Sequence, residues 1–252
     1  MTRNATIRLL QASRWLTVLG IVLCATVTRA QHQVPVTLQV DIVRDAAAKQ
    51  TKDNSNVVVW LTSADEFGDP VPSGRTEAPR QAPVIIQRNK TFEPHVLVVP
   101  VGSTVQFPNK DPFFHNVFSL FNGRRFDLGL YEGGASNSAH FDHTGISFLF
   151  CNIHPEMSAA VVVLNTPYYA LSDRSGRVSI AGVPDGRYRL HAWFERSSPE
   201  DLRKLEREIV ISSSSRALDP LHLADKGNPM LAHKNKYNQD YTPVTNPAYT
   251  RP

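Results

Sequence analysis

The chain has 252 residues and a formal net charge of +4, from 27 Lys and Arg against 23 Asp and Glu. Four of the basic residues and none of the acidic residues lie in the first 30 positions: Arg3, Arg8, Arg14 and Arg29. Without that segment, 23 residues of each sign remain. The positive charge therefore belongs to the amino-terminal segment, and we expect no binding to nucleic acid.

Residues 1–30 have the pattern of a secretory signal peptide. A basic start is followed by the apolar run Trp15–Val27, which is shorter than the roughly 20 residues that span a bilayer. The small residues Thr28 and Ala30 predict cleavage near Ala30. We expect a periplasmic or secreted bacterial protein with no membrane span after the signal is removed; a membrane anchor is the alternative interpretation.

Short runs rich in Val, Ile, Phe and Leu, separated by Gly, Pro, Asn and Asp, predict an all-β fold. The expected strands include Val36–Val43, Val57–Leu61, Val84–Gln87, Val96–Val99, Thr104–Phe107, Ile146–Phe150 and Ala159–Leu164. Ser198 followed by Pro199 and two acidic residues is typical of a helix start. From residue 213 the sequence has few apolar residues, so we expect a carboxy-terminal tail at residues 213–252 that is loose or draped over the surface.

Cys151 would be the only cysteine left after the signal peptide is removed, because the second, Cys24, lies within that segment. In an oxidising compartment a single thiol cannot form an internal disulfide. It must be buried, paired with another chain or bound to something. His154 and Met157 follow it at Cys-x-x-His-x-x-Met spacing, which favours binding.

A second histidine, His115, lies upstream between two phenylalanines and Asn116. One thiolate, two imidazoles and one thioether form the soft, mixed ligand set that a mononuclear electron-transfer copper prefers. Zinc rarely uses methionine, and calcium and magnesium prefer oxygen ligands. The expected cofactor is therefore one copper ion.

The run of residues 96–118 and the Cys151–Met157 loop resemble the cupredoxins, small blue copper proteins such as amicyanin and plastocyanin. In that family a strand and a Gly turn lead to the first copper histidine, which is followed by Asn, and a later strand ends in the copper cysteine. The resemblance covers about residues 84–164. It implies a Greek-key cupredoxin β-sandwich with one type-1 copper.

Carried over residue by residue, the resemblance implies that His115, Cys151 and His154 form the copper plane and that Met157 is a long axial ligand. Asn116 would tie the two ligand loops together through hydrogen bonds and restrain the thiolate. The backbone carbonyl of Phe114 would approach the open axial side. The ring edge of His154 would lie near solvent.

The chain also resembles bacterial proteins of the methylamine utilization protein type at Gln87–Lys90, Val96–Gly102 and Cys151–Met157. That label implies amine oxidation by analogy alone, because none of these residues recognises an amine.

Residues 171–194 resemble the later strands of the carboxypeptidase regulatory-like β-sandwich, a transthyretin-like or carbohydrate-binding-like fold. We expect residues 36–65 and 168–212 to form this accessory sandwich, with a cupredoxin domain at 80–165 inserted between them. The alternative is two sequential β modules with an extended amino-terminal hairpin. Pairing between residues 57–61 and 188–194 distinguishes the two.

The resulting hypothesis is an exported one-electron carrier, not an enzyme, acting as a monomer with a redox partner protein. The alternative is a β-sandwich that binds glycan or a cell-envelope partner and carries a vestigial or structural cupredoxin domain. That alternative requires exposed aromatics such as Tyr168, Tyr169 and Trp193. A copper enzyme would need further histidine clusters such as His-x-His, which the sequence lacks.

The other histidines are weaker candidates. We expect His140 and His143 to form a solvated pair, His95 to be exposed and His191 to be a packed sandwich residue.

Overall fold

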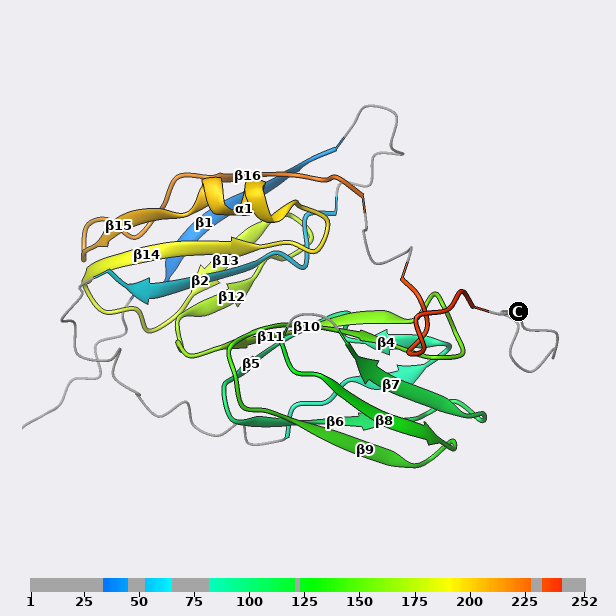
Figure 1. Ribbon diagram of the computed structural model, residues 1–252. Coiled ribbons are helices and arrows are strands. Elements are labelled where there is room, and N and C mark those ends of the chain that lie inside the picture. The colour runs from blue at the N-terminus through cyan, green and yellow to red at the C-terminus, as the bar shows by residue number, and fades with distance from the viewer. Residues whose placement is uncertain (1–33, 45–52, 65–81, 121–122, 228–232, 242–252) are drawn as a thin grey trace, which may run out of the picture. The chain divides into compact units, whose positions relative to one another are not determined.

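The computed structural model describes residues 34–44, 53–64, 82–120, 123–227 and 233–241. The predicted signal peptide lies outside these ranges. The described residues form an all-β fold with one short helix, as predicted (Figure 1). In chain order the elements are β1 (Val36–Val43), β2 (Val58–Ser63), β3 (Ile86–Arg88), β4 (Thr91–Glu93), β5 (Val96–Pro100), β6 (Ser103–Pro108), β7 (His115–Ser119), β8 (Phe126–Tyr131), β9 (Ser136–Phe141), β10 (Gly145–Phe150), β11 (Ser158–Leu164), β12 (Tyr169–Leu171), β13 (Arg177–Ile180), β14 (Gly186–Trp193), α1 (Pro199–Leu205), β15 (Arg207–Ile211) and β16 (Leu221–Ala224).

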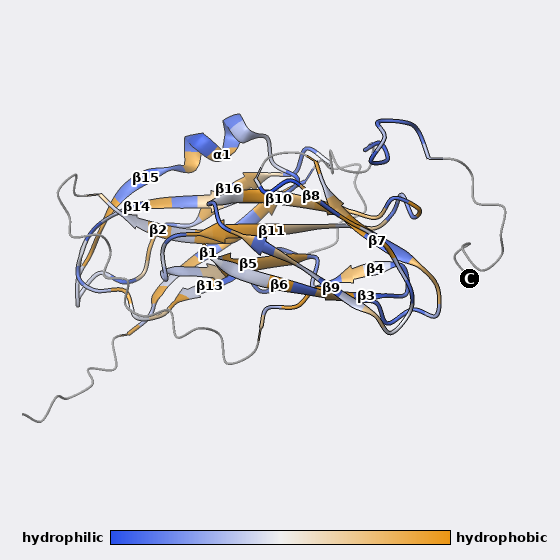
Figure 2. Ribbon diagram, turned by 60° about the horizontal axis from the view of Figure 1, so that its bottom comes forward, coloured by the Kyte–Doolittle hydropathy of each residue, from blue (hydrophilic) through white to orange (hydrophobic). Residues whose placement is uncertain are grey.

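The first group of strands forms what we call the flanking sandwich. A three-stranded sheet in the order β13-β1-β16 packs against a four-stranded sheet in the order β12-β2-β14-β15. Side chains alternate along β1, so that Val36, Leu38, Val40 and Ile42 are buried in the core between the sheets. Figure 2 shows α1 as largely polar, and it buries none of its residues completely.

The pairing of β2 determines how the chain connects the two groups of strands. β2 pairs with β14, with Leu61 opposite Leu190, and also with β12. Residues on either side of β3–β11 therefore share one sheet, so β3–β11 lie within the chain path of the flanking sandwich. β1 pairs with β13 and β16 rather than with β2. β1 and β2 therefore do not form the amino-terminal hairpin that the alternative arrangement requires.

Strands β3–β11 form what we call the ligand sandwich. A five-stranded sheet in the order β5-β11-β10-β7-β8 packs against the β6-β9 pair and the β3-β4 hairpin. The core between them includes Phe107, Phe141, Leu149 and Val161, all fully buried. This core also contains Cys151 and Met157.

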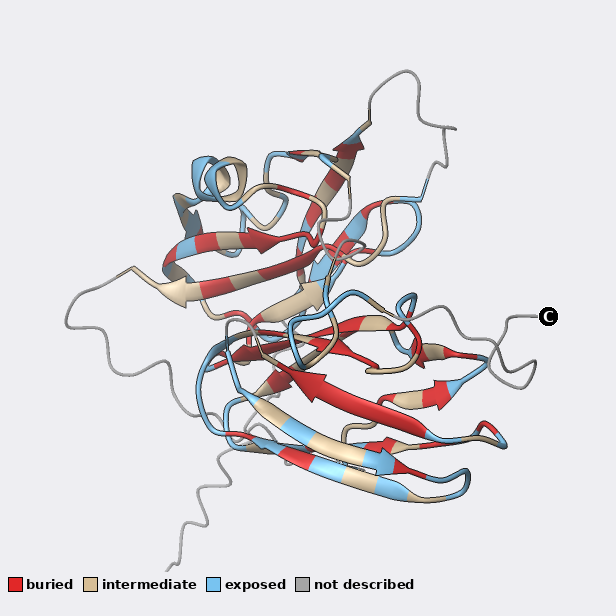
Figure 3. Ribbon diagram, turned by 45° about the vertical axis from the view of Figure 1, so that its right-hand side comes forward, coloured by how far each residue is buried: buried red, intermediate tan, exposed pale blue. Residues whose placement is uncertain are grey.

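Strand β11 is buried on both faces, which explains its continuous run of small and apolar residues. Ala159, Val161 and Val163 belong to the core of the ligand sandwich. Ala160, Val162 and Leu164 instead join a separate cluster with Val58 of β2 and Trp193 of β14. Figure 3 shows the unbroken burial of β7, which lies in the same sheet as β11.

The carboxy-terminal region is more ordered than its composition predicted. Leu221 and Leu223 are buried, and β16 pairs in parallel with residues 40–43 of β1. The expectation of a loose tail from residue 213 is therefore wrong for β16, because two apolar side chains and an open edge of β1 suffice to order a short strand. The helix prediction is confirmed: α1 begins after Ser198, whose hydroxyl accepts a hydrogen bond from the Asp201 amide.

No helix among the described residues is long and apolar enough to cross a membrane.

His95 and Glu195 form an ion pair between the start of β5 and the residues that follow β14. His95 Nε2 lies 2.6 Å from Glu195 Oε2, and His95 Nδ1 lies 3.0 Å from the Ser158 carbonyl oxygen. Both ring nitrogens thus face acceptors, which a protonated imidazole satisfies. The hydrogen bond to Glu195 accordingly raises the pKa of His95.

This pair predicts a pH-dependent contribution to the free energy of unfolding. The contribution is complete below the unfolded-state pKa of histidine, about 6.5, and is lost as the pH rises through the raised pKa of folded His95. Urea unfolding should therefore give a smaller loss of stability from about pH 6 to about pH 9 in Glu195→Gln than in the native protein. The exposed Glu132→Gln is the control, and equal losses in native protein and Glu195→Gln would contradict the prediction.

Candidate metal centre

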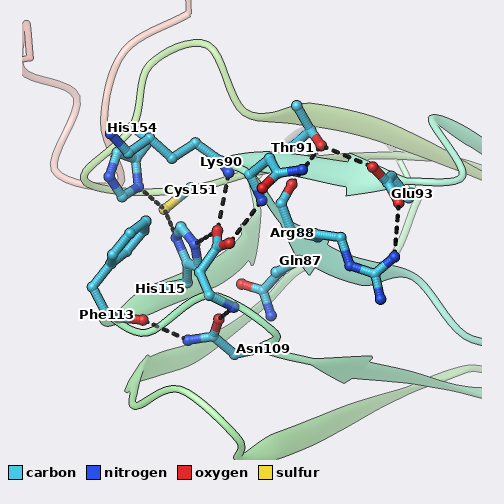
Figure 4. Close-up of polar contacts among 12 residues, drawn as sticks. Gln87, Arg88, Lys90, Thr91, Glu93, Asn109, Phe113, His115, Cys151 and His154 are labelled. Atoms are coloured by element: carbon cyan, nitrogen blue, oxygen red, sulfur yellow. Dashed lines mark hydrogen bonds and ion pairs between the residues drawn. The ribbon is translucent and has the colours of Figure 1, made fainter. Parts of the chain in front are cut away.

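Three predicted ligands meet at one end of the ligand sandwich. Cys151 Sγ lies 3.8 Å from His115 Nδ1 and 3.7 Å from His154 Nδ1. The three donor atoms all lie within 4.8 Å of one another, and all three residues are buried. Figure 4 shows both imidazole rings turned toward the sulfur atom.

The strand arrangement brings these residues together. His115 is the first residue of β7, Cys151 follows the last residue of β10, and β7 and β10 are neighbours in the sheet. Phe150 pairs with Ser158, so residues 151–157 form the connection between β10 and β11. Two backbone hydrogen bonds close this loop: the Cys151 amide donates to the Met157 carbonyl at 3.3 Å, and the Met157 amide donates to the His154 carbonyl at 3.0 Å. Met157 is fully buried within the same loop.

The orientation of the His115 ring is held by Asp111. His115 Nε2 lies 2.7 Å from Asp111 Oδ2, in contact between two buried residues. Because the carboxylate accepts the proton on Nε2, the lone pair of the neutral ring is left on Nδ1, the nitrogen that faces Cys151. The carboxylate therefore selects the tautomer that can bind a metal.

The β3–β4 turn holds Asp111 in turn. Asn89 and Lys90 have φ angles of 52° and 54°, as in the two-residue hairpins of type I′. Their backbone amides donate to Asp111 Oδ1 and Oδ2 at 2.7 and 2.9 Å. Burial raises the pKa of Asp111, but these bonds and the one from His115 hold it below its usual value overall.

Burial also changes the protonation of the ligands. It lowers the pKa of His115, and burial together with the nearby His115 lowers the pKa of His154 to about 4. Both rings are therefore neutral at pH 7 and offer lone pairs. Burial raises the pKa of the Cys151 thiol, although the backbone amides of Ile153, Asn116 and His154 oppose that shift. A metal that binds here must release the thiol proton.

The geometry and chemistry of the donors fit a metal ion. Bonds of about 2.1 Å to nitrogen and about 2.3 Å to sulfur that meet at about 120° join donor atoms roughly 3.8 Å apart. The two sulfur–nitrogen distances of 3.7 and 3.8 Å match that separation. Two imidazoles and a thiol, with a buried thioether in the same loop, are the donor types of a blue-copper site.

Asn116 forms hydrogen bonds through both its side chain and its backbone. It lies beside a β-bulge in the pairing of β7 with β8. Its side-chain amide donates to Asp127 Oδ1 and to the Gly129 carbonyl of β8. The hydrogen bonding between Asn116 and the thiolate that the resemblance implies runs through the Asn116 backbone rather than through its side chain. The backbone amide of Asn116 forms a hydrogen bond with the Cys151 sulfur, which lowers the pKa of the thiol against the effect of burial.

Two further expectations concern exposure. His154 is 1% exposed, so the prediction that its ring edge lies near solvent is wrong. Phe113 packs against its ring at a centroid distance of 5.8 Å, and residues 233–241 contact its loop. Phe114 is 46% exposed, and the axial approach of its carbonyl stays a prediction.

The remaining histidines lie outside the cluster. His140 and His143 are exposed, as expected for a solvated pair. His191 stacks on Trp60 at 5.1 Å. His95 is only partly exposed because it binds Glu195, so the expectation of an exposed residue is wrong.

The sequence reasoning missed Asp111 and the contacts of Tyr241. A carboxylate four positions before a proposed histidine ligand is a usable signal, because ligand histidines commonly donate their second nitrogen to a carboxylate. Tyr241 lies 90 positions from its partner Cys151, and a local sequence pattern cannot predict a contact over that separation.

Comparisons with known proteins found similar solved structures but no matching family. No family model and no curated protein matches the chain. Among solved structures it is similar to a purple cupredoxin from Nitrosopumilus maritimus, at 26% identity over 32% of this chain and 99% of that chain, with a TM-score of 0.31. It is also similar to a reduced amicyanin variant (26% identity, 35% and 87% coverage, TM-score 0.32) and to a copper-containing nitrite reductase from Thermus scotoductus (22% identity, 50% and 28% coverage, TM-score 0.33). TM-scores of this size carry no argument, so the proposal below depends on the geometry of the site.

The contact between Asp111 and His115 predicts a role in metal affinity. Asp111→Asn should lower the affinity for copper or for the spectroscopic probe Co(II) by about 10- to 100-fold, because the amide offers one accepting oxygen where three donors now share the two oxygens of the carboxylate. Competition titration against a chelator measures the change. Asp142→Asn is the matched control, since Asp142 is an exposed acid that contacts Arg124 and His143. An unchanged affinity in Asp111→Asn would contradict the role.

Proposed function

We propose that the protein is an exported type-1 copper protein that carries single electrons. The observation that carries this proposal is the convergence of His115 Nδ1, Cys151 Sγ and His154 Nδ1 within 4.8 Å in a buried site. No acid group lies in that cluster of donors. A thiol and two imidazoles favour copper over calcium, magnesium and other oxygen-seeking ions.

In this proposal His115, Cys151 and His154 hold the ion, and Met157 supplies a weak fourth ligand. The bound copper would provide the one-electron couple between its two oxidation states. The protein supplies a site that keeps water out and holds its donors in place. The loop hydrogen bonds of Cys151 and Met157 and the contact of Asp111 with His115 limit rearrangement, which favours fast electron exchange.

The alternative of a glycan-binding sandwich requires exposed aromatic residues, and the three candidates are buried or partly buried. Tyr168 and Trp193 are buried at 8% and 6% exposure, and Trp193 packs in the cluster shared with β11. Tyr169 is partly buried against the same cluster. These rings do not form the exposed row that would stack on a sugar.

The remaining parts of the proposal follow from the sequence. Export rests on the signal pattern of residues 1–30, and the absence of an enzymatic activity rests on the lack of histidine clusters for a second copper. We further propose a monomer that exchanges electrons with a separate redox protein. No residue described above recognises an amine, so the proposal includes no amine substrate.

Copper loading tests the proposal directly. The mature apo-protein should bind one equivalent of Cu(II) and turn intensely blue, with the paramagnetic-resonance spectrum of a type-1 site. Cys151→Ala should lose the colour because the sulfur ligand is gone. His154→Ala should also lose it, while the matched variant His140→Ala, at an exposed histidine of β9, should stay blue.

Circular dichroism of each variant separates loss of a ligand from loss of the fold. A native protein that stays colourless after loading with either Cu(II), or Cu(I) followed by oxidation, would overturn the proposed function.

A further inference from the structure

The segment His233–Tyr241, which we call the strap, lies against the loop that carries Cys151 and His154. The Tyr241 hydroxyl donates a hydrogen bond to the Cys151 carbonyl at 2.8 Å. The ring of His233 donates through Nε2 to the Pro155 carbonyl at 2.9 Å. These two contacts fall on either side of His154 in the chain. Figure 1 shows the strap, in orange-red, beside the connection between β10 and β11.

A third set of contacts joins the strap to the ligand loop and to β8, the neighbour of the strand that carries His115. The Lys236 amide donates to Asn152 Oδ1 at 3.1 Å, and Lys236 Nζ lies 2.7 Å from Asp127 Oδ2. The other oxygen of Asp127 accepts from the side chain of Asn116, the neighbour of His115. The Lys236–Asp127 pair is mostly shielded on the lysine side, at 19% exposure against 38% for the aspartate. The strap is therefore bonded directly to the loop that carries Cys151 and His154, and only indirectly, through Asp127 of β8, to Asn116 beside His115.

Aromatic packing adds to these hydrogen bonds. The His233 ring lies 4.1 Å from the Phe150 ring, centroid to centroid, with an interplanar angle of 33°. Tyr241 packs edge-on against His233 at 5.2 Å. Phe150 is fully buried and immediately precedes Cys151. The strap thus meets the loop with complementary apolar and polar groups, in contrast to a segment that merely crosses the surface.

The strap contacts the backbone on either side of His154, whose ring also packs against Phe113 and His115. A Cys-x-x-His-x-x-Met loop at the end of a sandwich is expected to present its histidine to solvent, yet His154 is 1% exposed. We propose that the strap determines the electron-transfer specificity of the copper site, by shielding His154 and admitting only partners that contact or displace residues 233–241. This inference rests on the proposed function for its electron-transfer part, whereas the shielding itself does not require copper.

The first experiment measures the shielding in the apo-protein. Diethylpyrocarbonate modifies accessible imidazoles, and mass spectrometry of peptides reports His154 separately from His233. If modification requires the strap to open, its rate follows the open population. Tyr241→Phe removes one hydrogen bond and should raise the rate at His154 about fivefold, and the triple variant His233→Leu, Lys236→Met, Tyr241→Phe should raise it about 100-fold.

Lys234→Met is the matched control for the strap variants. Lys234 is an exposed residue of the same segment, and its ion pair with Asp240 spans 3.9 Å. In the Lys234→Met variant, His154 should be modified at the same rate as in the native protein. The strap proposal is overturned if His154 reacts as slowly in the triple variant as in the native protein, or if Lys234→Met raises the rate as much as Tyr241→Phe does.

The second experiment measures electron exchange after copper loading. Hexacyanoferrate(III) takes one electron from the reduced protein and becomes hexacyanoferrate(II), while Cu(I) becomes Cu(II). Stopped-flow rates should rise in the triple variant and stay native in Lys234→Met. Equal rates in the native protein and the triple variant would overturn control of access by the strap. A protein that never binds copper would instead overturn the proposed function and leave the apo-protein result standing.

Discussion

A buried carboxylate constrains the whole candidate metal centre. Asp111 is 6% exposed, and a charge in such surroundings is tolerated only where several donors compensate for its lost hydration. The donors here are the two backbone amides of the Asn89–Lys90 turn and the ring of His115. The same interaction therefore shapes the β3–β4 hairpin, holds the approach to β7 and turns one imidazole nitrogen toward Cys151. Loss of this carboxylate would remove the acceptor of three donors and leave one ligand free to rotate.

The second structural constraint is the burial of the sheet that carries the ligands. β11 contributes alternate residues to the core of the ligand sandwich and to the cluster shared with β2 and β14. A strand packed on both faces can shift only if two cores rearrange. The loop of residues 151–157 joins this strand to β10, so its ends are fixed while the loop itself stays short. A rigid frame of this kind suits a site that changes its charge by one electron without changing its geometry.

The parts of the fold that depend on local pattern could be predicted, and those that depend on distant pairing could not. The strands with dense apolar residues, such as Val36–Val43 and Ser158–Leu164, stand out because burial demands them. The sequence did not predict β8 and β9. Their residues, Phe126–Tyr131 and Ser136–Phe141, mix glycine, polar and exposed positions, as strands at a sheet edge can. The sequence did not predict β16 because this strand is ordered by pairing with the edge of β1, about 180 positions away in the chain. The contacts of the strap could not be predicted either, because its partners Cys151 and Pro155 lie about 80 to 90 positions away in the chain.

The donor types of the site follow from the sequence alone. Cysteine, histidine and methionine at fixed spacing within one short loop can reach a common point in few ways, and the chemistry of sulfur and imidazole then selects the ion. Only the tertiary structure decided that His115 lies within reach of them, that Asp111 orients a ligand, and that His154 is covered rather than open to solvent. The physical reason is that ligand identity is a property of side-chain chemistry. Orientation and exposure instead depend on which distant backbone and side-chain groups the fold brings alongside.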